Sequence, residues 1–149
     1  MGDEKSDGTL RIAIERRVAE LRDEHATCES VAIRIFVEEF GILPEEALHE
    51  TLARTSRMFG GPQCSCQPLR IAMLALGILG SRAASPGPSE PIQALNSLEK
   101  RFRDTCCPAC HAEYRVGGHA SVPMATSCTD ALVNGVLWVR ELATERDWI

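Results

Sequence analysis

The sequence predicts a small all-α protein, a single domain of five or six helices over residues 1–149, with a cysteine-rich loop before the last helix. Apolar residues recur with a period of about 3.6 along successive segments, which is typical of amphipathic helices. Proline and glycine stand where such helices begin and end. A 44% hydrophobic content in 149 residues suffices for one core. We expect bundle-like or orthogonal packing.

The first two helices are predicted on either side of His25. Residues 1–8 are polar and acidic and are expected to be disordered. The first helix has an apolar stripe at i, i+4, i+8 and i+11, made of Leu10, Ile14, Val18 and Leu21. The second begins near Thr27 and ends before Gly41, with an inner face of Cys28, Ala32, Ile35, Phe36 and Phe40. Because no Gly or Pro separates the two, one long bent helix is the alternative.

The middle of the chain predicts two more helices. One starts at Pro44 and stops at Gly60, and its inner face is Leu48, Leu52, Thr55 and Phe59. The next runs from about Pro68 to Leu79 and is apolar almost all round, with Arg70 as its only charge. This pattern predicts the buried central helix of a bundle. Residues 81–91, rich in Ser, Pro and Gly, are predicted to be a linker loop.

Two helices complete the prediction. Ser89 is expected to cap the first of them, whose inner face is Ile92, Leu95, Glu99 and Phe102. Residues 106–126 show no periodicity and contain three cysteines and two histidines, which predicts a functional loop. The closing helix starts near Ser127 and presents Leu132, Val136, Val139 and Leu142.

Charge and hydropathy exclude several classes of function. The net charge is −5 and the basic residues are dispersed, so no nucleic-acid partner is expected. The acidic N-terminus lacks the pattern of a secretory signal. The longest apolar stretch, residues 71–80, is 10 residues long, against roughly 20 for a bilayer-spanning helix. We therefore predict a cytoplasmic protein that does not span a membrane.

Seven cysteines in a reducing compartment indicate metal binding or redox chemistry rather than a disulfide framework. Cys28, Cys66 and Cys128 each fall at or just before the first turn of a predicted helix. Backbone N–H groups and the helix dipole there favour the thiolate, which is the nucleophilic and metal-binding form. The alternative is that each is a small buried hydrophobic residue.

The other cysteines occur in two close-spaced motifs, Cys64-Ser65-Cys66 and Cys106-Cys107-Pro108-Ala109-Cys110. Thiolates at such spacing suit zinc, copper(I) or an iron–sulfur cluster. Cys107 to His111 also match the C-x-x-C-H motif of c-type haem attachment. That attachment belongs to exported proteins, so c-type haem is not expected, and His111 is interpreted as a loop residue or an extra ligand.

Five segments together resemble a known family: Cys28 with Val37-Glu38-Glu39-Phe40-Gly41, Met58-Phe59-Gly60-Gly61, Cys66 eleven residues before Gly77, Phe102 before Cys106-Cys107, and Cys128 before Ala131-Leu132-Val133. On these residues the chain resembles the C_GCAxxG_C_C family of redox-active proteins, small helical proteins with four characteristic cysteines. The chain departs from the family where Gln67, Pro68 and Ile71 replace Gly, Ala and Gly. A related domain in split-Soret cytochromes binds an iron–sulfur centre through cysteines, so the resemblance implies a cysteine-ligated cluster.

The predicted function is a redox-active protein that binds an iron–sulfur cluster or another soft metal (iron, zinc or copper) for electron transfer or redox sensing. The predicted ligands, expected to converge, are Cys28, Cys66, Cys107 and Cys128, with Cys106 in place of Cys107 as one alternative and Cys64, Cys110 and His111 as further candidates. Two other functions stay open. One is metal-free thiol–disulfide exchange by Cys107 and Cys110, an oxidoreductase-like activity at most, and the other is a zinc-binding structural or sensory module. The expected partner is a redox protein, and a homodimer is an open alternative.

Overall fold

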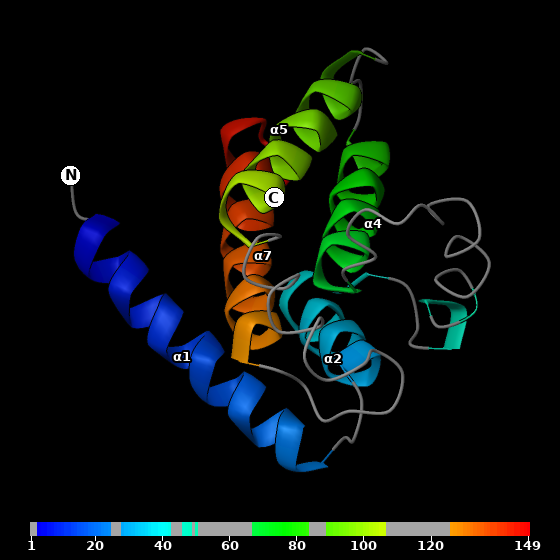
Figure 1. Cartoon of the computed structure of the whole chain (residues 1–149). Coiled ribbons are helices and arrows are strands. Elements are labelled where there is room, and N and C mark those ends of the chain that lie inside the picture. The colour runs from blue at the N-terminus through cyan, green and yellow to red at the C-terminus, as the bar shows by residue number, and fades with distance from the viewer. Residues whose placement is uncertain are drawn as a thin grey trace.

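The computed structural model describes residues 3–24, 28–42, 46–48, 50, 67–83, 89–106 and 126–149. Within these ranges it contains five long helices and no strand (Figure 1). The predicted all-α fold is confirmed. One continuous cluster of buried apolar side chains joins all five helices.

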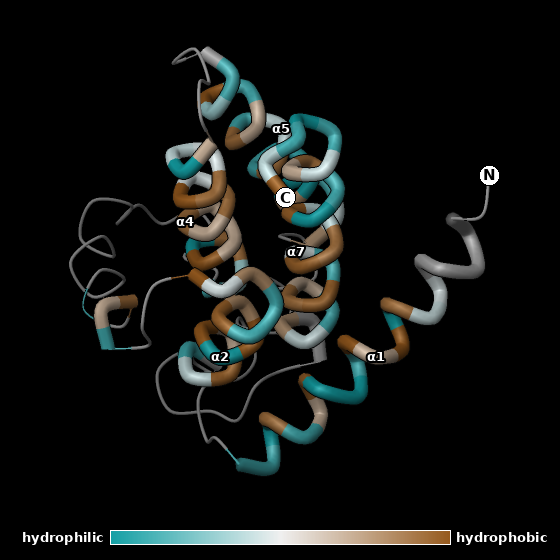
Figure 2. The backbone as a smooth tube through the Cα atoms, turned by 180° about the vertical axis from the view of Figure 1, so that it is seen from behind, coloured by the Kyte–Doolittle hydropathy of each residue, from teal (hydrophilic) through white to brown (hydrophobic). Residues whose placement is uncertain are grey.

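Helix α1, Asp3–Glu24, packs on the bundle from about Leu10 onward, and its first turns project away from the other helices (Figures 1 and 2). The predicted stripe is confirmed, because Leu10 packs against the core and three further members are buried, namely Ile14, Val18 and Leu21. Residues 3–8, expected to be disordered, belong to this helix instead. Once the stripe nucleates a helix, each added residue extends it at little cost.

Helix α2, Cys28–Phe40, runs in a different direction from α1, so the alternative of one long bent helix is wrong (Figure 1). It ends as predicted at Gly41, whose φ of 57° is a left-handed conformation that glycine adopts without strain. The Gly41 N–H donates to the Val37 carbonyl at 2.9 Å and closes the last turn. The buried side is wider than predicted and consists of Val31, Ala32, Ile33, Ile35 and Phe36.

The helix predicted from Pro44 lies mostly outside the described residues. Residues 46–48 are helical, and Leu48 is buried as expected. Its other predicted core residues, Leu52, Thr55 and Phe59, lie outside the described ranges.

Helix α4, Gln67–Arg82, occupies the centre of the bundle and contacts α2, α5 and α7. This confirms the prediction of a central helix. Its burial is not uniform, because one side, with Met73, Leu74 and Ile78, is only half-buried. Ser81 continues the helix and donates its hydroxyl to the Gly77 carbonyl at 2.9 Å. The predicted linker at 81–91 is therefore shorter, since α4 includes 81–82 and the next helix begins at Ser89.

Helix α5, Ser89–Thr105, starts at the predicted cap residue but turns a different face inward. The buried residues are Ala94, Leu98 and Phe102, spaced at i, i+4 and i+8. Ile92, predicted to be internal, is 58% exposed, and Glu99 pairs with Arg103 on the surface. The predicted face is confirmed at Phe102 and at Leu95, which packs against the core. It was wrong at Ile92 and Glu99 because it placed a carboxylate in the core, whereas the stripe through Leu98 contains no charge.

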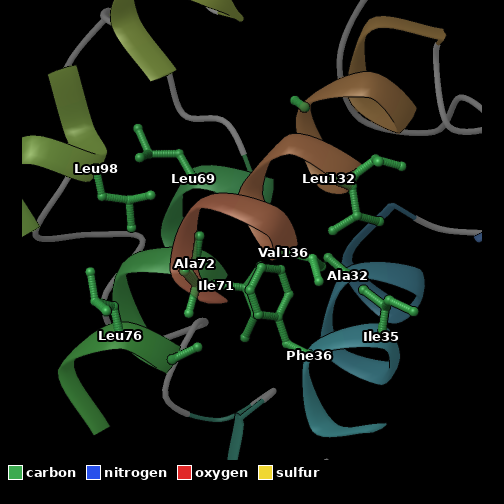
Figure 3. Packing of buried hydrophobic residues seen from close by; sticks show 14 of the residues in the cluster. Ala32, Ile35, Phe36, Leu69, Ile71, Ala72, Leu76, Leu98, Leu132 and Val136 are labelled. Carbon is green, nitrogen blue, oxygen red and sulfur yellow. The ribbon is translucent and has the colours of Figure 1, made fainter. Parts of the chain in front are cut away.

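Helix α7, Thr126–Glu145, buries all four residues of its predicted face, Leu132, Val136, Val139 and Leu142. Figure 3 shows the Phe36 ring of α2 among side chains of α4 and α7 at the centre of the core. After α7 the chain turns back, with Asp147 at φ 57° and the Trp148 N–H bonded to the Ala143 carbonyl at 2.8 Å. The Trp148 ring then lies against Gly80, near the end of α4.

Candidate metal centre

Three cysteines stand at the starts of three observed helices. Cys28 is the first residue of α2, and Cys128 is the third residue of α7. Cys66 lies outside the described residues, but α4 begins at the next residue, Gln67. The sequence-based prediction of three helix-start cysteines is therefore confirmed at the level of the helix boundaries.

The three helices run in the same direction. A Cβ on Gly135 of α7 would lie 3.6 Å from both the Phe36 ring of α2 and the Ala72 side chain of α4. Further along, Arg140 of α7 pairs with Glu39 of α2 at 2.8 Å, and the chain beyond α7 reaches Gly80 of α4. Because residue numbers increase together along all three helices, α2, α4 and α7 begin at the same end of the bundle.

Helix α5 brings a fourth cysteine to this end. It starts where α4 finishes and runs back at an angle across the bundle (Figure 1). Phe102, near its end, lies against Gly135 in the middle of α7, so the residues after Phe102 lie towards the half of α7 that contains Cys128. Cys106 directly follows α5, and its N–H donates to the Phe102 carbonyl at 2.8 Å, continuing the helical pattern by one residue. We call this end, marked by Cys28, Gln67, Cys106 and Cys128, the cysteine end.

Cys106 and Cys128 are both buried, with 5% and 1% of their surface exposed. Both belong to the hydrophobic core cluster. This burial fits a water-excluding metal site, and it also fits the alternative in which cysteine acts as a small core residue.

Most other predicted ligands lie outside the described residues: Cys64, Cys66, Cys107, Cys110 and His111. The same holds for the side chain of Cys28, although its backbone is described. Within the described part of the chain, no group of three or more His, Cys, Asp or Glu side chains is placed to hold a metal ion. The convergence of four cysteines on one centre therefore stays a prediction.

The first turn of α4 contains two buried polar atoms, Gln67 Oε1 and Arg70 Nε, that have no hydrogen-bond partner within the part of the chain that the structure describes. These residues are three positions apart and lie on the same side of the helix. An unpaired buried donor on a guanidinium is costly. Sequence analysis identified Arg70 only as the single charge of an apolar helix. A lone charge on a helix that is otherwise buried indicates that the side chain needs an anionic partner, and the sequence analysis did not draw that conclusion.

The opposite end of α2 is held by arginines from three helices. Glu38 accepts two hydrogen bonds from Arg17 of α1, at 2.6 and 2.8 Å. These hydrogen bonds are the largest cause that lowers the pKa of Glu38, and the two carboxylates that face Arg17 raise its own pKa. Arg140 of α7 pairs with Glu39 and lies over the Phe40 ring, while Arg82 of α4 donates to the Gly41 carbonyl at 3.2 Å. Cations beside a helix C-terminus are favourable, so these contacts fix the position of α2.

Comparisons with protein-family models, curated proteins and solved structures found no match to this chain. The resemblance to the C_GCAxxG_C_C family therefore stays a prediction. Among the described helices, none has the length and apolarity needed to cross a bilayer.

Proposed function

We propose that the chain binds an iron–sulfur cluster or another soft metal through cysteines at the cysteine end, and that it acts in electron transfer or redox sensing. One observation carries the proposal. Helices α2, α4 and α7 begin, and α5 ends, at the same end of the bundle, and the sequence places a cysteine at each of these four points. Cysteines used only as small core residues would have no reason to share one end.

The donor set fits a soft metal. Thiolates bind iron, zinc and copper(I) more readily than hard cations. A cysteine at the start of α2 or α7 is close to the positive end of a helix dipole, which favours the deprotonated ligand form. Several thiolates around one metal leave a net negative charge, and Arg70 in the first turn of α4, whose Nε is buried without a hydrogen-bond partner among the described residues, is a counter-charge for it. The resemblance to a family with four characteristic cysteines supports the same assignment.

In this proposal the chain binds the metal, orients the cysteine ligands and excludes water from the site. Cys28, Cys66, Cys106 or Cys107, and Cys128 would hold the metal, and the buried residues behind Cys106 and Cys128 keep water from that side. A bound cluster would supply one-electron transfer, with a potential set by burial and by hydrogen bonds to the sulfurs. A bound zinc ion would instead supply stability alone.

Anaerobic purification of the full chain tests the proposal. We expect either charge-transfer absorption with iron and sulfide, or zinc or copper, in a stoichiometric amount by elemental analysis. The matched variant C128S should lose most of the bound metal while keeping its helical circular dichroism. A colourless, metal-free protein that takes up neither zinc nor iron and sulfide on reconstitution would exclude the proposal and favour metal-free thiol chemistry.

A further inference from the structure

The chain beyond α7 turns back towards α4 through a defined helix-ending motif. Asp147 has a φ of 57°, which is a left-handed conformation. The Asp147 N–H donates to the Thr144 carbonyl at 3.1 Å, and the Trp148 N–H donates to the Ala143 carbonyl at 2.8 Å. This pair of hydrogen bonds is the Schellman motif, in which the residue after the left-handed one often makes an apolar contact. In this chain that residue is Trp148, so the motif directs an indole ring back onto the bundle.

Trp148 packs on a glycine of α4. Two atoms of its six-membered ring, Cη2 and Cζ3, lie 3.1 Å from the position that a Cβ on Gly80 would take. A side chain at position 80 would therefore crowd the ring. The Arg146 guanidinium lies over the same ring, 5.8 Å from its centroid, and donates to the Leu142 carbonyl at 3.1 Å. The ring is thus held by a cation–π contact from its own segment as well as by its packing on α4.

Two residues that are unfavourable in their own elements make this contact possible. Gly80 lies inside α4, where glycine is less stable than alanine because it loses more conformational freedom on folding. Asp147 has a Cβ and adopts a left-handed conformation that such residues rarely take. Both allow Trp148 to pack on Gly80. We interpret the contact as a specific feature of the fold rather than incidental packing.

Residues 146–149 form a small unit with few buried groups. The Trp148 side chain is half-buried, Asp147 is exposed, and Ile149 is 50% exposed. The backbone hydrogen bonds of this unit run to the last turn of α7, whereas its contact with α4 is made by the Trp148 ring. Segments with few buried apolar contacts open at a lower free energy than the core of a protein. The ring can therefore leave Gly80 while α4 and α7 stay folded.

We propose that residues 146–149 are a latch on the bundle. When the latch is closed, Trp148 on Gly80 holds the ends of α4 and α7 together. The latch opens as a unit while the helices persist, which uncovers Gly80 and lets the last turn of α4 move relative to α7. The cysteine end lies at the other end of α4 and α7, so the latch does not depend on the proposed metal binding.

Fluorescence of Trp148 tests the latch. The chain has two tryptophans, so the measurement is made on full chains with Trp138→Phe, which retains an aromatic ring beside Phe102. In this background Gly80→Val is compared with Gly77→Val, the matched control in the same helix, because nothing lies within 4 Å of a Cβ at Gly77. We expect Gly80→Val to shift the Trp148 emission to longer wavelength and to raise its acrylamide quenching constant about twofold or more, while circular dichroism shows intact helices. Gly77→Val should change neither.

A second pair of variants acts on the latch without changing α4. Asp147→Pro cannot adopt a positive φ and lacks the N–H that bonds to α7, so Trp148 should become exposed. Asp147→Gly adopts the same φ without strain and should keep Trp148 protected. The inference is overturned if Asp147→Pro leaves Trp148 as protected from acrylamide as in the parent chain, or if it loses the helical circular dichroism, because the segment would then be part of the core. It is overturned equally if Gly80→Val and Gly77→Val expose Trp148 to the same extent.

Discussion

At Gly135, α7 lies close to side chains of α2, α4 and α5. A methyl group there would lie 2.9 Å from Phe102 Cζ and 3.6 Å from Ala72 and Phe36. Phe102 is fully buried and packed against Trp138, so its ring has little room to move away. This contact fixes the relative positions of the helices that carry Cys106 and Cys128.

We therefore predict that Gly135→Ala lowers the free energy of unfolding. Overpacking a core costs about 1–3 kcal/mol, and a contact of 2.9 Å with a buried ring forces atoms to move, so we expect the cost to exceed the gain of about 1 kcal/mol from placing alanine in a helix. Gly77→Ala in α4 is the matched control, because nothing lies within 4 Å of its added methyl group, and it should raise stability by about 0.4–1 kcal/mol. Urea denaturation followed by circular dichroism measures both. Equal effects of the two substitutions would contradict the close approach at Gly135.

At the scale of elements, the ion pairs around α2 show how the helices are held in register. Arg17 of α1 and Arg140 of α7 bind adjacent carboxylates, Glu38 and Glu39. The helix pattern of the sequence predicts where these side chains lie on their own helices. It does not predict their partners, which are 21 and 101 residues away.

The Arg17–Glu38 contact predicts a pH dependence. The folded-state pKa of Glu38 is lowered, mainly by hydrogen bonds from Arg17. A carboxylate with a lowered pKa adds stability above its unfolded pKa, which is about 4.3, and that contribution is lost as the pH falls through the folded-state value. A double-mutant cycle with Arg17→Met and Glu38→Gln should therefore give a favourable coupling at neutral pH that weakens as the pH is lowered through the titration of the Glu38 carboxyl. A coupling that does not change between neutral and acidic pH would argue against this ion pair.

At the scale of the whole molecule, the direction of the helices brings the starts of α2, α4 and α7 to one end of the bundle, although they are far apart in the sequence. Cys28 and Cys128 are separated by most of the chain, yet α2 and α7 start at the same end. A metal bound there would link α2, α4, α5 and α7 at that end. It should therefore stabilise the fold as a unit.

Metal binding should accordingly shift global unfolding. A ligand that binds only the folded state at a free concentration 100-fold above its Kd adds about 2.7 kcal/mol. We expect zinc at that ratio to raise the midpoint of thermal unfolding of the reduced protein, and a chelator to reverse the rise. In C128S zinc should have little effect. A wild-type midpoint that is unchanged by zinc would contradict a structural role of the metal.

The sequence by itself determined the all-α class, the inner faces of α1 and α7, the end of α2 at Gly41, and the three cysteines at helix starts. These features are local, because periodicity, caps and turn residues act within a few positions of each other. Only the tertiary structure decided the inward face of α5, the shared direction of α2, α4 and α7, and the contact of Phe102 with Gly135. Each depends on side chains that meet across helices, and the packing energy of such contacts is set by shape in three dimensions rather than by spacing along the chain.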